Sequence, residues 1–223
     1  MQGTAHGLAQ VVFGACKERS KVGAGLVLSA GDVVLKNSWL TYNVGTWGLL
    51  YISGQDSFVH FENMQVTHNR AVGGTIVYCE VCHDTFFLNT TMKANFADTD
   101  GGMLMLENFA GDVLIHNSVI QGNSARSEGG VIYAITSTQK QSNLAVHVFN
   151  SVIYNNSAAN GGFIYASFHA MRLLNLTSSV FQANRVREPC RPLRSPCLDR
   201  QRKSCASRAH VLLGQSLQPH RPP

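Results

Sequence analysis

A recurring asparagine is the feature that most restricts how this 223-residue chain can fold. Its six copies are separated by 26, 26, 28, 33 and 28 residues, and an apolar residue stands three places before each: Asn43, Asn69, Asn95, Asn123, Asn156 and Asn184. A repeat of this length is too short for a strand–helix–strand unit, which needs roughly 30 residues or more. A period of about 20–50 residues is typical of a solenoid, in which each repeat buries its apolar side against its neighbours.

Each repeat contains short stretches that alternate between apolar and mixed positions. Six places before this recurring asparagine, every copy has another polar residue: Asn37, Asn63, Asn89, Asn117, Asn150 and, in the sixth copy, Ser178. Apolar residues precede this slot by two and four places, as in Val59-His60-Phe61. A further stretch lies between the two asparagines, and a third follows a glycine pair. The alternation predicts three short strands and three turns per repeat.

The predicted architecture is therefore all-β: a parallel β-helix of about six coils that occupies residues 1–186, with a degenerate first coil. Coils stacked at about 4.8 Å place equivalent residues above one another. We expect both asparagine series to form ladders inside the turns, because amide side chains satisfy turn backbone groups and each other. The glycine pairs suit turns that need positive φ or close backbone approach.

The repeats resemble those of the polymorphic outer-membrane proteins of Chlamydia, which carry a GG motif followed by apolar residues and an F-x-x-N motif. Phe181-Gln182-Ala183-Asn184 matches the second motif, and Gly129-Gly130-Val131-Ile132 is one of four matches to the first. The likeness covers roughly residues 11–186, including a degraded copy at Phe13-Gly14-Ala15-Cys16. It implies a right-handed, pectin-lyase-like β-helix, a location outside the cell or on its surface, and a role in adhesion or surface structure.

Residues 187–223 differ sharply from the repeats. All six prolines and eight of the 18 Lys and Arg residues lie there, so this segment carries a charge of +6 and residues 1–186 carry −1. A Pro- and Arg-rich sequence without periodicity predicts a disordered tail, and an error in the gene model would produce the same break. The nearly neutral repeats give no reason to expect nucleic-acid binding.

The sequence at both ends leads us to expect a piece of a longer protein. Repeat sequence begins within a dozen residues of Met1 without an apolar signal core, and the last repeat stops before its glycine pair. No apolar run reaches the roughly 20 residues of a membrane-spanning helix. A membrane attachment would therefore lie in segments outside this sequence.

Outward positions after the glycine pairs are apolar or aromatic. On stacked coils they would form an outer strip, for which we expect a protein or glycan ligand: Tyr51, Met105, Tyr133, Phe163 and Tyr165. The same pattern assigns to the outer strip Leu49, Val77, Met103 and Val131. Ile76 and Tyr78 are predicted to alternate with them and to point into the core. Exposed apolar strips mark binding surfaces, although loops could also cover this one.

Other candidate chemistry is weaker. Asp98 and Asp100 are the only close acidic pair, as a carbohydrate-active enzyme of this fold would use, but aspartate is also common in turns. Cys79-x-x-Cys82-His83 matches a haem-attachment motif, yet it sits among repeats and lacks a fourth zinc ligand. A local disulfide or free thiols explain it better. We therefore predict no cofactor and no metal site.

Histidines and glycosylation sequons are two further groups of candidate residues. His60, His116 and His147 are predicted on the outward side of one strand column, where solvated histidines are favoured over a metal or pH-sensitive patch. Glycosylation sequons begin at Asn89, Asn155 and Asn175, of which Asn89 is expected to be buried in a ladder. The favoured function is a non-enzymatic surface or secreted binding module, with a polysaccharide lyase or hydrolase as the alternative.

Overall fold

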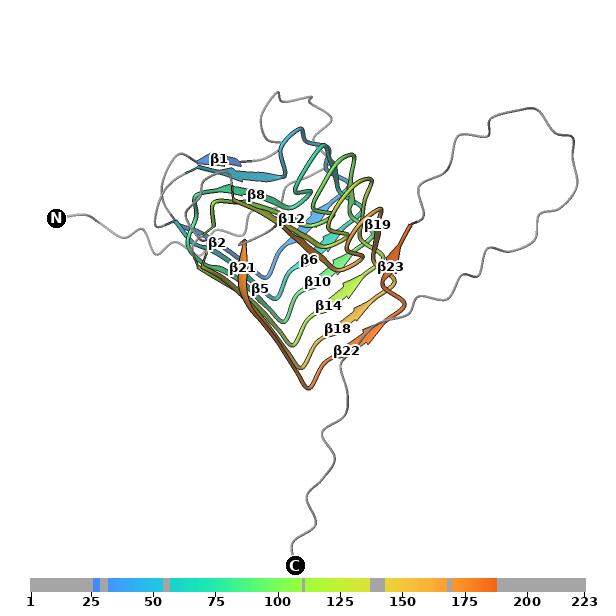
Figure 1. The fold of residues 1–223 in the computed structure, drawn as a ribbon. Coiled ribbons are helices and arrows are strands. Elements are labelled where there is room, and N and C mark those ends of the chain that lie inside the picture. The colour runs from blue at the N-terminus through green and yellow to red at the C-terminus, as the bar shows by residue number, and fades with distance from the viewer. Residues whose placement is uncertain are drawn as a thin grey trace, which may run out of the picture. The chain divides into compact units, whose positions relative to one another are not determined.

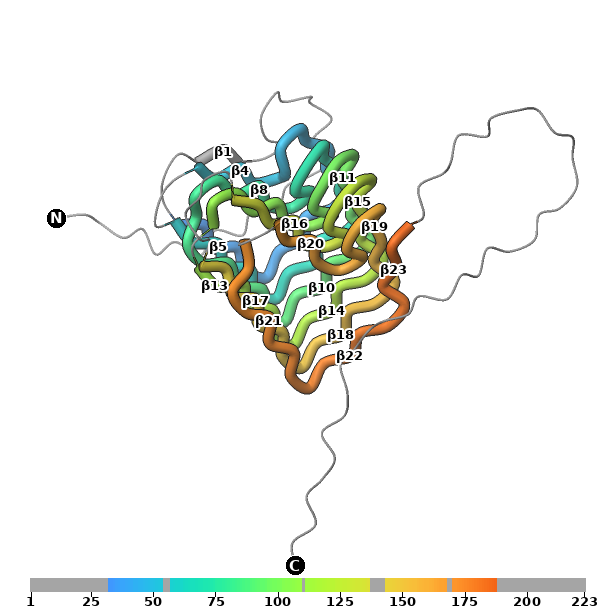
Figure 2. Tube along the Cα trace, viewed as in Figure 1, coloured from blue at the N-terminus to red at the C-terminus, as the bar shows by residue number. Residues whose placement is uncertain are grey.

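The computed structural model describes residues 26–28, 32–53, 57–109, 111–136, 143–167 and 170–187. Within these ranges the chain forms strands and turns, without a helix. The strands stack as a parallel β-solenoid, seen nearly end-on in Figure 1 and as nested loops in Figure 2. The predicted all-β parallel β-helix is therefore confirmed.

Four parallel sheets run the length of the stack. Sheet I contains β1 (Leu26–Leu28), β4 (Leu50–Ile52), β8 (Val77–Glu80), β12 (Leu104–Glu107), β16 (Ile132–Ile135) and β20 (Ile164–Ala166). Sheet II contains β2 (Val33–Lys36), β5 (Val59–Glu62), β9 (Thr85–Leu88), β13 (Asp112–His116), β17 (Leu144–Phe149) and β21 (Met171–Thr177). Sheet III contains β3 (Trp39–Thr41), β6 (Gln65–Thr67), β10 (Thr91–Lys93), β14 (Val119–Gln121), β18 (Val152–Tyr154) and β22 (Val180–Gln182). Sheet IV contains β7 (Arg70–Ala71), β11 (Phe96–Ala97), β15 (Ser124–Ala125), β19 (Ser157–Ala158) and β23 (Arg185–Val186).

Sheet IV was not predicted from the sequence. Its strands have only two residues each, too few to show an alternating pattern. The inward side of this sheet is lined by small residues, with Ala97, Ala125 and Ala158 fully buried. Alanine at this position lets the chain pass close to the axis, so that each coil gains a fourth side between the asparagine turn and the glycine turn.

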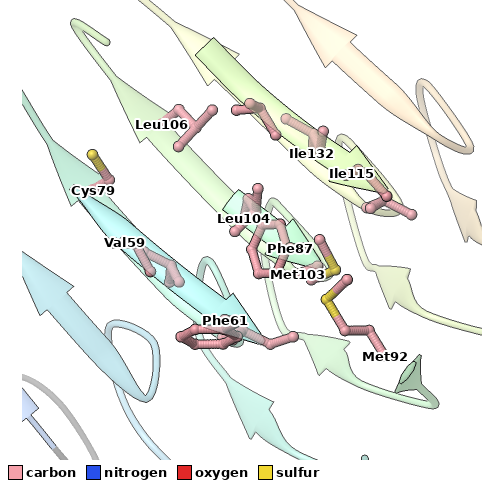
Figure 3. Close-up of a cluster of buried hydrophobic side chains, with 14 of the residues drawn as sticks. Val59, Phe61, Cys79, Phe87, Met92, Met103, Leu104, Leu106, Ile115 and Ile132 are labelled. Atoms are coloured by element: carbon pink, nitrogen blue, oxygen red, sulfur yellow. The ribbon is translucent and has the colours of Figure 1, made fainter. Parts of the chain in front are cut away.

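The core fills the space enclosed by the coils. Phe61 and Phe87 are fully buried on adjacent coils, with ring centroids 5.3 Å apart in an edge-to-face arrangement. Figure 3 shows them beside Met92, Met103 and Leu104, which come from sheet III, the glycine turn and sheet I. Each such side chain contributes about 1.5–3 kcal/mol through burial. The predicted inward apolar residues of sheets II and III thus build one continuous core, except in the last coil, where Leu174 and Leu176 are exposed.

The asparagines at 43, 69, 95, 123, 156 and 184 form a hydrogen-bonded ladder. From Asn43 to Asn156, each Nδ2 group donates to the Oδ1 atom of the asparagine in the next coil, at distances of 2.8 to 3.2 Å. The same Oδ1 atom accepts the backbone N–H of the preceding asparagine. From Asn69 onward, Nδ2 also donates to a carbonyl of the coil before, such as Leu40 O for Asn69. The buried amides therefore satisfy their own hydrogen-bonding groups and those of the turn.

The second series has a different role. Asn37, Asn63, Asn89, Asn117, Asn150 and Ser178 all have φ between 47° and 54°, which is the left-handed region that asparagine tolerates. All six residues are exposed, and among the described residues one side-chain hydrogen bond joins neighbours of this series, from Asn63 Nδ2 to Asn37 Oδ1 at 2.9 Å. The expected buried ladder is therefore wrong for this series, because backbone conformation rather than amide pairing selects asparagine here.

A buried hydroxyl column follows these asparagines and was not anticipated. Ser118 Oγ accepts the N–H of Thr90, Ser151 Oγ accepts that of Ser118, and Ser179 Oγ accepts that of Ser151, each at 3.1 Å. This column forms hydrogen bonds between successive coils at the corner between sheets II and III, as the asparagine ladder does at the corner between sheets III and IV. Its signal in the sequence was weak because Met64 interrupts it.

The chain's two ends lie largely outside the described residues. These include the degenerate first coil up to residue 25 and the predicted disordered tail, apart from Arg187. The last strand, β23, ends at Val186, which is the predicted end of the repeats. Among the described residues, no helix is long and apolar enough to cross a membrane.

Candidate binding face

The outer side of sheet I carries a column of aromatic and thioether side chains. Pairing of its strands aligns Tyr51 with Tyr78, Tyr78 with Met105, Met105 with Tyr133, and Tyr133 with Tyr165. We call these five residues the tyrosine column. Tyr78 and Met105 are 9% and 8% exposed, whereas the other three are half-buried. The column is thus a partly accessible surface whose middle is the most covered.

The rings of the tyrosine column stack on one another. The centroids of Tyr51 and Tyr78 are 5.1 Å apart with an interplanar angle of 8°, and those of Tyr133 and Tyr165 are 5.7 Å apart at 15°. At the coil spacing of about 4.8 Å, nearly parallel neighbouring rings must lie face to face. The ring faces are therefore directed along the stack, and the column presents ring edges and hydroxyl groups outward.

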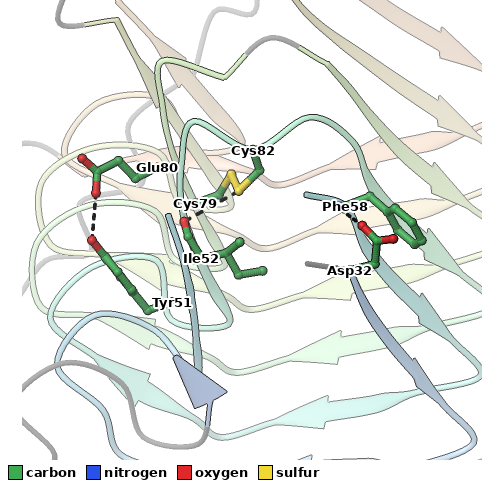
Figure 4. Close-up of a disulfide and its surroundings, with 7 residues drawn as sticks. All are labelled: Asp32, Tyr51, Ile52, Phe58, Cys79, Glu80 and Cys82. Atoms are coloured by element: carbon green, nitrogen blue, oxygen red, sulfur yellow. Dashed lines mark hydrogen bonds between the residues drawn. A yellow bond between two sulfur atoms is a disulfide. The ribbon is translucent and has the colours of Figure 1, made fainter. Parts of the chain in front are cut away.

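Carboxylates line both sides of the tyrosine column. Glu80 and Glu107 occupy equivalent positions at the ends of β8 and β12, and Tyr51 donates a hydrogen bond of 2.8 Å to Glu80 Oε2. Figure 4 shows this pair on the side of β8 opposite Cys79 and Ile52. Asp100 and Glu128 lie in the turns before β12 and β16, and Asp100 Oδ1 accepts the Glu128 N–H at 3.0 Å. All four acids are half-buried.

The phenol groups respond to this environment. The hydrogen bond to Glu80, then burial and the charges of Glu80 and Glu107, raise the pKa of Tyr51 to about 12. Burial, followed by the charges of Asp100 and Glu128, raises the pKa of Tyr133 to about 12. Burial and Glu107 raise the pKa of Tyr78 further. The phenols therefore stay protonated near neutral pH and act as hydrogen-bond donors in an electronegative setting.

Tyr78 was assigned to the wrong side of its strand. The sequence pattern placed it in the core with Ile76 and put Val77 outside, but Val77 is fully buried and Tyr78 faces outward. The cause is the glycine pair: Gly74 rather than Gly73 has positive φ, at 53°, and its N–H bonds to Asp100 O just before Gly101. Coil alignment therefore begins one residue later than the GG motif indicated.

The members of the predicted outer strip nearest the glycine pairs belong to the core instead. Phe163 packs against the main hydrophobic cluster and meets Phe181 with centroids 5.2 Å apart. The equivalent residues are buried for the same reason, since they belong to the turn that leads into the strand: Leu49, Met103 and Val131. Of the five residues predicted to bind a ligand, Tyr51, Met105, Tyr133 and Tyr165 share one face, and Phe163 does not.

Trp47 is a neighbour of this face that the sequence interpretation missed. Its ring centroid lies 5.4 Å from that of Tyr78, and it is 36% exposed. A β-carbon at Gly73 would lie 2.9 Å from Met105 Sδ and 3.4 Å from Trp47. The glycine turn thus packs over the middle of the tyrosine column, which explains why Tyr78 and Met105 are its least exposed members.

Asp98 and Asp100, the acidic pair considered for the enzymatic alternative, have different surroundings. Asp98 receives two hydrogen bonds from the Arg70 guanidinium, at 2.7 and 3.0 Å, and lies 3.5 Å from Arg126. Asp100 instead lies among the turn groups beside the tyrosine column. Burial raises the pKa of Asp100, opposed by the hydrogen bond from the Glu128 N–H and reinforced by the Glu128 charge.

The histidines do not form the single column that was expected. His60 and His147 share an outward column on sheet II with Phe86 and Leu114 between them, while His116 lies in the neighbouring column. Burial, followed by the charge of Lys36, lowers the pKa of His60. Within the described part of the chain, no group of three or more His, Cys, Asp or Glu residues is arranged to hold a metal ion.

Cys79 and Cys82 form a disulfide, one of the two states that the sequence left open. Both residues are buried, and Figure 4 shows the disulfide beside Ile52. Of the glycosylation sequons, Asn89 is exposed rather than buried, Asn155 is exposed, and Asn175 is half-buried and accepts a 3.0 Å hydrogen bond from Thr177. The expectation for Asn89 was therefore wrong.

Comparison with known proteins does not add a relative. No protein-family description, curated protein sequence or solved structure matches this chain. The assignment of the fold therefore comes from the structure, and the likeness to the chlamydial repeats rests on the sequence motifs alone.

Proposed function

We propose that this chain is a non-enzymatic β-helix module of a surface or secreted protein, which holds an extended ligand along the outer face of sheet I. The observation that carries the proposal is the tyrosine column with its two flanking rows of carboxylates. A row of four tyrosines and one methionine over five strands, half-buried at both ends, is typical of a recognition surface rather than of a solvated sheet face.

Two further observations support the location. A disulfide between buried cysteines is typical of proteins that fold in an oxidising compartment. The repeat motifs resemble those of the polymorphic outer-membrane proteins of Chlamydia, which implies adhesion or surface structure. A rigid solenoid built of equivalent coils also suits a module that spaces or displays a binding surface.

The test compares two double variants of the full chain. Tyr133→Ala with Tyr165→Ala removes the two half-buried rings at one end of the column, while Gln121→Ala with Tyr154→Ala alters outward residues of sheet III on the same coils. Both proteins are applied to arrays of oligosaccharides and of short peptides. Loss of the wild-type signals in the first variant and their retention in the second is expected. Equal binding by all three proteins would refute the proposal.

A carbohydrate-active enzyme is a second candidate because Asp100, a carboxyl with a raised pKa, lies beside Tyr133 and Glu128. Such a carboxyl can act as a general acid at mildly acidic pH. Reducing-sugar and unsaturated-product assays on pectin and alginate separate the two functions. Activity that disappears in Asp100→Asn would replace the binding proposal with the enzymatic one.

A further inference from the structure

We infer that the ligand of this face is an arginine- or lysine-rich peptide segment in an extended conformation. The inference rests on the proposed binding function and names the chemistry of the partner. Its basis is the arrangement of four carboxylates around the tyrosine column: Glu80, Glu107, Asp100 and Glu128.

Within the described part of the chain, the four carboxylates have no cationic partners. Among the residues that the structure describes, no ion pair joins any of them to a lysine, arginine or histidine. Their contacts are with neutral groups: the Tyr51 hydroxyl on Glu80, the Tyr78 hydroxyl on Glu107, the Glu128 N–H on Asp100, and the Asn160 amide on Glu128 at 3.3 Å. Four half-buried acids around one apolar row thus generate a local negative potential.

Two acids on the other sheets pair with a basic residue. Glu62 on sheet II pairs with Lys36 at 2.6 Å, and Asp98, at the end of sheet IV, pairs with Arg70 at 2.7 Å. Carboxylates at those positions stand in coil-to-coil ladders with a basic residue. The same device is missing around the tyrosine column, although the stack offers equivalent positions for it. The unpaired acids of sheet I are therefore available to a cation from outside.

Ring orientation favours a basic peptide over a sugar. A pyranose packs on the exposed face of an aromatic ring, but each tyrosine in this column has one face stacked on a neighbouring ring: Tyr51 on Tyr78, and Tyr133 on Tyr165. Ring edges and the Met105 side chain offer apolar contact for the methylene stems of lysine or arginine, which carry their charge at the tip. The tips would then reach the carboxylates on either side of the column.

The dimensions match a short segment. Five stacked coils at about 4.8 Å span roughly 19 Å between the first and last members of the column. An extended peptide advances about 3.3 Å per residue, so about six residues cover the column. Side chains that alternate to the two sides of such a segment would face Glu80 and Glu107 on one side, and Asp100 and Glu128 on the other.

The experiment measures binding of a fluorescent oligoarginine peptide of about six residues to the full chain by anisotropy, over a series of salt concentrations. The binding variant is Glu80→Gln with Glu107→Gln, which keeps an acceptor for the Tyr51 hydroxyl. The control variant is Glu62→Gln with Asp112→Asn, which removes the same charge from sheet II. We expect binding that weakens with salt, an affinity about tenfold lower in the binding variant, and at most a twofold loss in the control.

The outcomes separate the inference from the proposed function. Equal loss in both variants would show attraction to net charge alone and would overturn the inference. Failure of oligoarginine to bind, together with tyrosine-dependent binding of a neutral cello-oligosaccharide, would overturn the inference and leave the binding function standing. Absence of any tyrosine-dependent binding on the arrays would overturn both.

Discussion

Truncation of one ladder asparagine should destabilise the fold far more than truncation of an exposed one in the same coil. Asn123 is fully buried, and its side chain makes four hydrogen bonds. It donates to Met92 O at 3.0 Å and to Asn156 Oδ1 at 3.2 Å, and it accepts the N–H and the Nδ2 group of Asn95 at 3.0 and 2.8 Å. Asn123→Ala removes all four.

The size of the effect follows from the groups left behind. Asn156 Oδ1 keeps a donor, the Asn123 N–H at 2.8 Å, but the N–H and one Nδ2–H of the fully buried Asn95 lose their acceptor. A buried donor without a partner costs about 1–3 kcal/mol, so two cost about 2–6 kcal/mol. A domain is stable by only about 5–15 kcal/mol. We therefore expect Asn123→Ala to remove roughly half of the free energy of unfolding.

Asn117→Ala is the matched control. Asn117 lies in the same coil but is exposed, with φ of 49°. Alanine adopts that conformation less readily, at a cost of about 1 kcal/mol, and Asn117→Gly should restore the stability. Asn123→Asp should be no better than Asn123→Ala, since it would set an oxygen against Met92 O and Asn156 Oδ1.

Urea unfolding followed by circular dichroism measures these changes. Solenoids can unfold in parts, so the slope of the transition is compared as well as its midpoint. A loss in Asn123→Ala equal to that in Asn117→Ala would refute the reasoning, because it would mean that the buried amides contribute no more than backbone preference does.

Three further results are expected. Asp100→Asn keeps an acceptor for the Glu128 N–H and should raise the free energy of unfolding by about 0.5 kcal/mol at neutral pH. Because the folded-state pKa of Asp100 is raised, the contribution of this carboxyl to stability is full below the usual carboxyl pKa and is lost as pH rises. Thermal melts of the variant and the wild type should therefore converge in acid. Tyr51 and Tyr133, with pKa values of about 12, should ionise only as the protein unfolds above pH 10. In an alkaline titration, the part of the tyrosinate absorbance that Tyr51→Phe with Tyr133→Phe removes should therefore appear together with the change in circular dichroism; its appearance before that change would contradict this. Gly102→Ala should lower the melting temperature more than Gly122→Ala, although of the two only Gly122 has positive φ. The reason is that a β-carbon at Gly102 would collide with Gly130 O, while one at Gly122 meets nothing within 4 Å. The reverse order of the two melting temperatures would refute the packing argument.

The spacing of asparagines was sufficient to predict the stack of coils, because a ladder needs one residue of the same type per coil at a buried turn. The same reasoning overreached for the series that includes Asn89 and Asn117, since asparagine also serves isolated left-handed positions. A buried amide and a left-handed turn residue give the same letter in the sequence. Only the neighbouring structure distinguishes them.

The face of sheet I was predicted in part for a comparable reason. Tyr51, Tyr133 and Tyr165 were placed correctly because a single rule of alternation holds in their coils. Tyr78 was misplaced because Gly73 and Gly74 are chemically equal in sequence, and only one of them takes positive φ. The spacing of Tyr78-x-Glu80 and Met105-x-Glu107 would have shown the correct register. The carboxylate rows could not be foreseen, since they join residues from strands and turns of different coils.

The corner between sheet I and sheet II varies in length more than the other corners of the coil. Connections from sheet II to sheet III, such as residues 117–118, and from sheet III to sheet IV, such as residues 122–123, keep the same two-residue length throughout. The passage from sheet I to sheet II varies, with residues 108–111 in one coil and 136–143 in the next. Foreign sequence inserted at this single edge would leave every ladder in register. The module therefore offers insertion sites that repeat at the coil spacing, and new peptides can be grafted there along one side beside the tyrosine column.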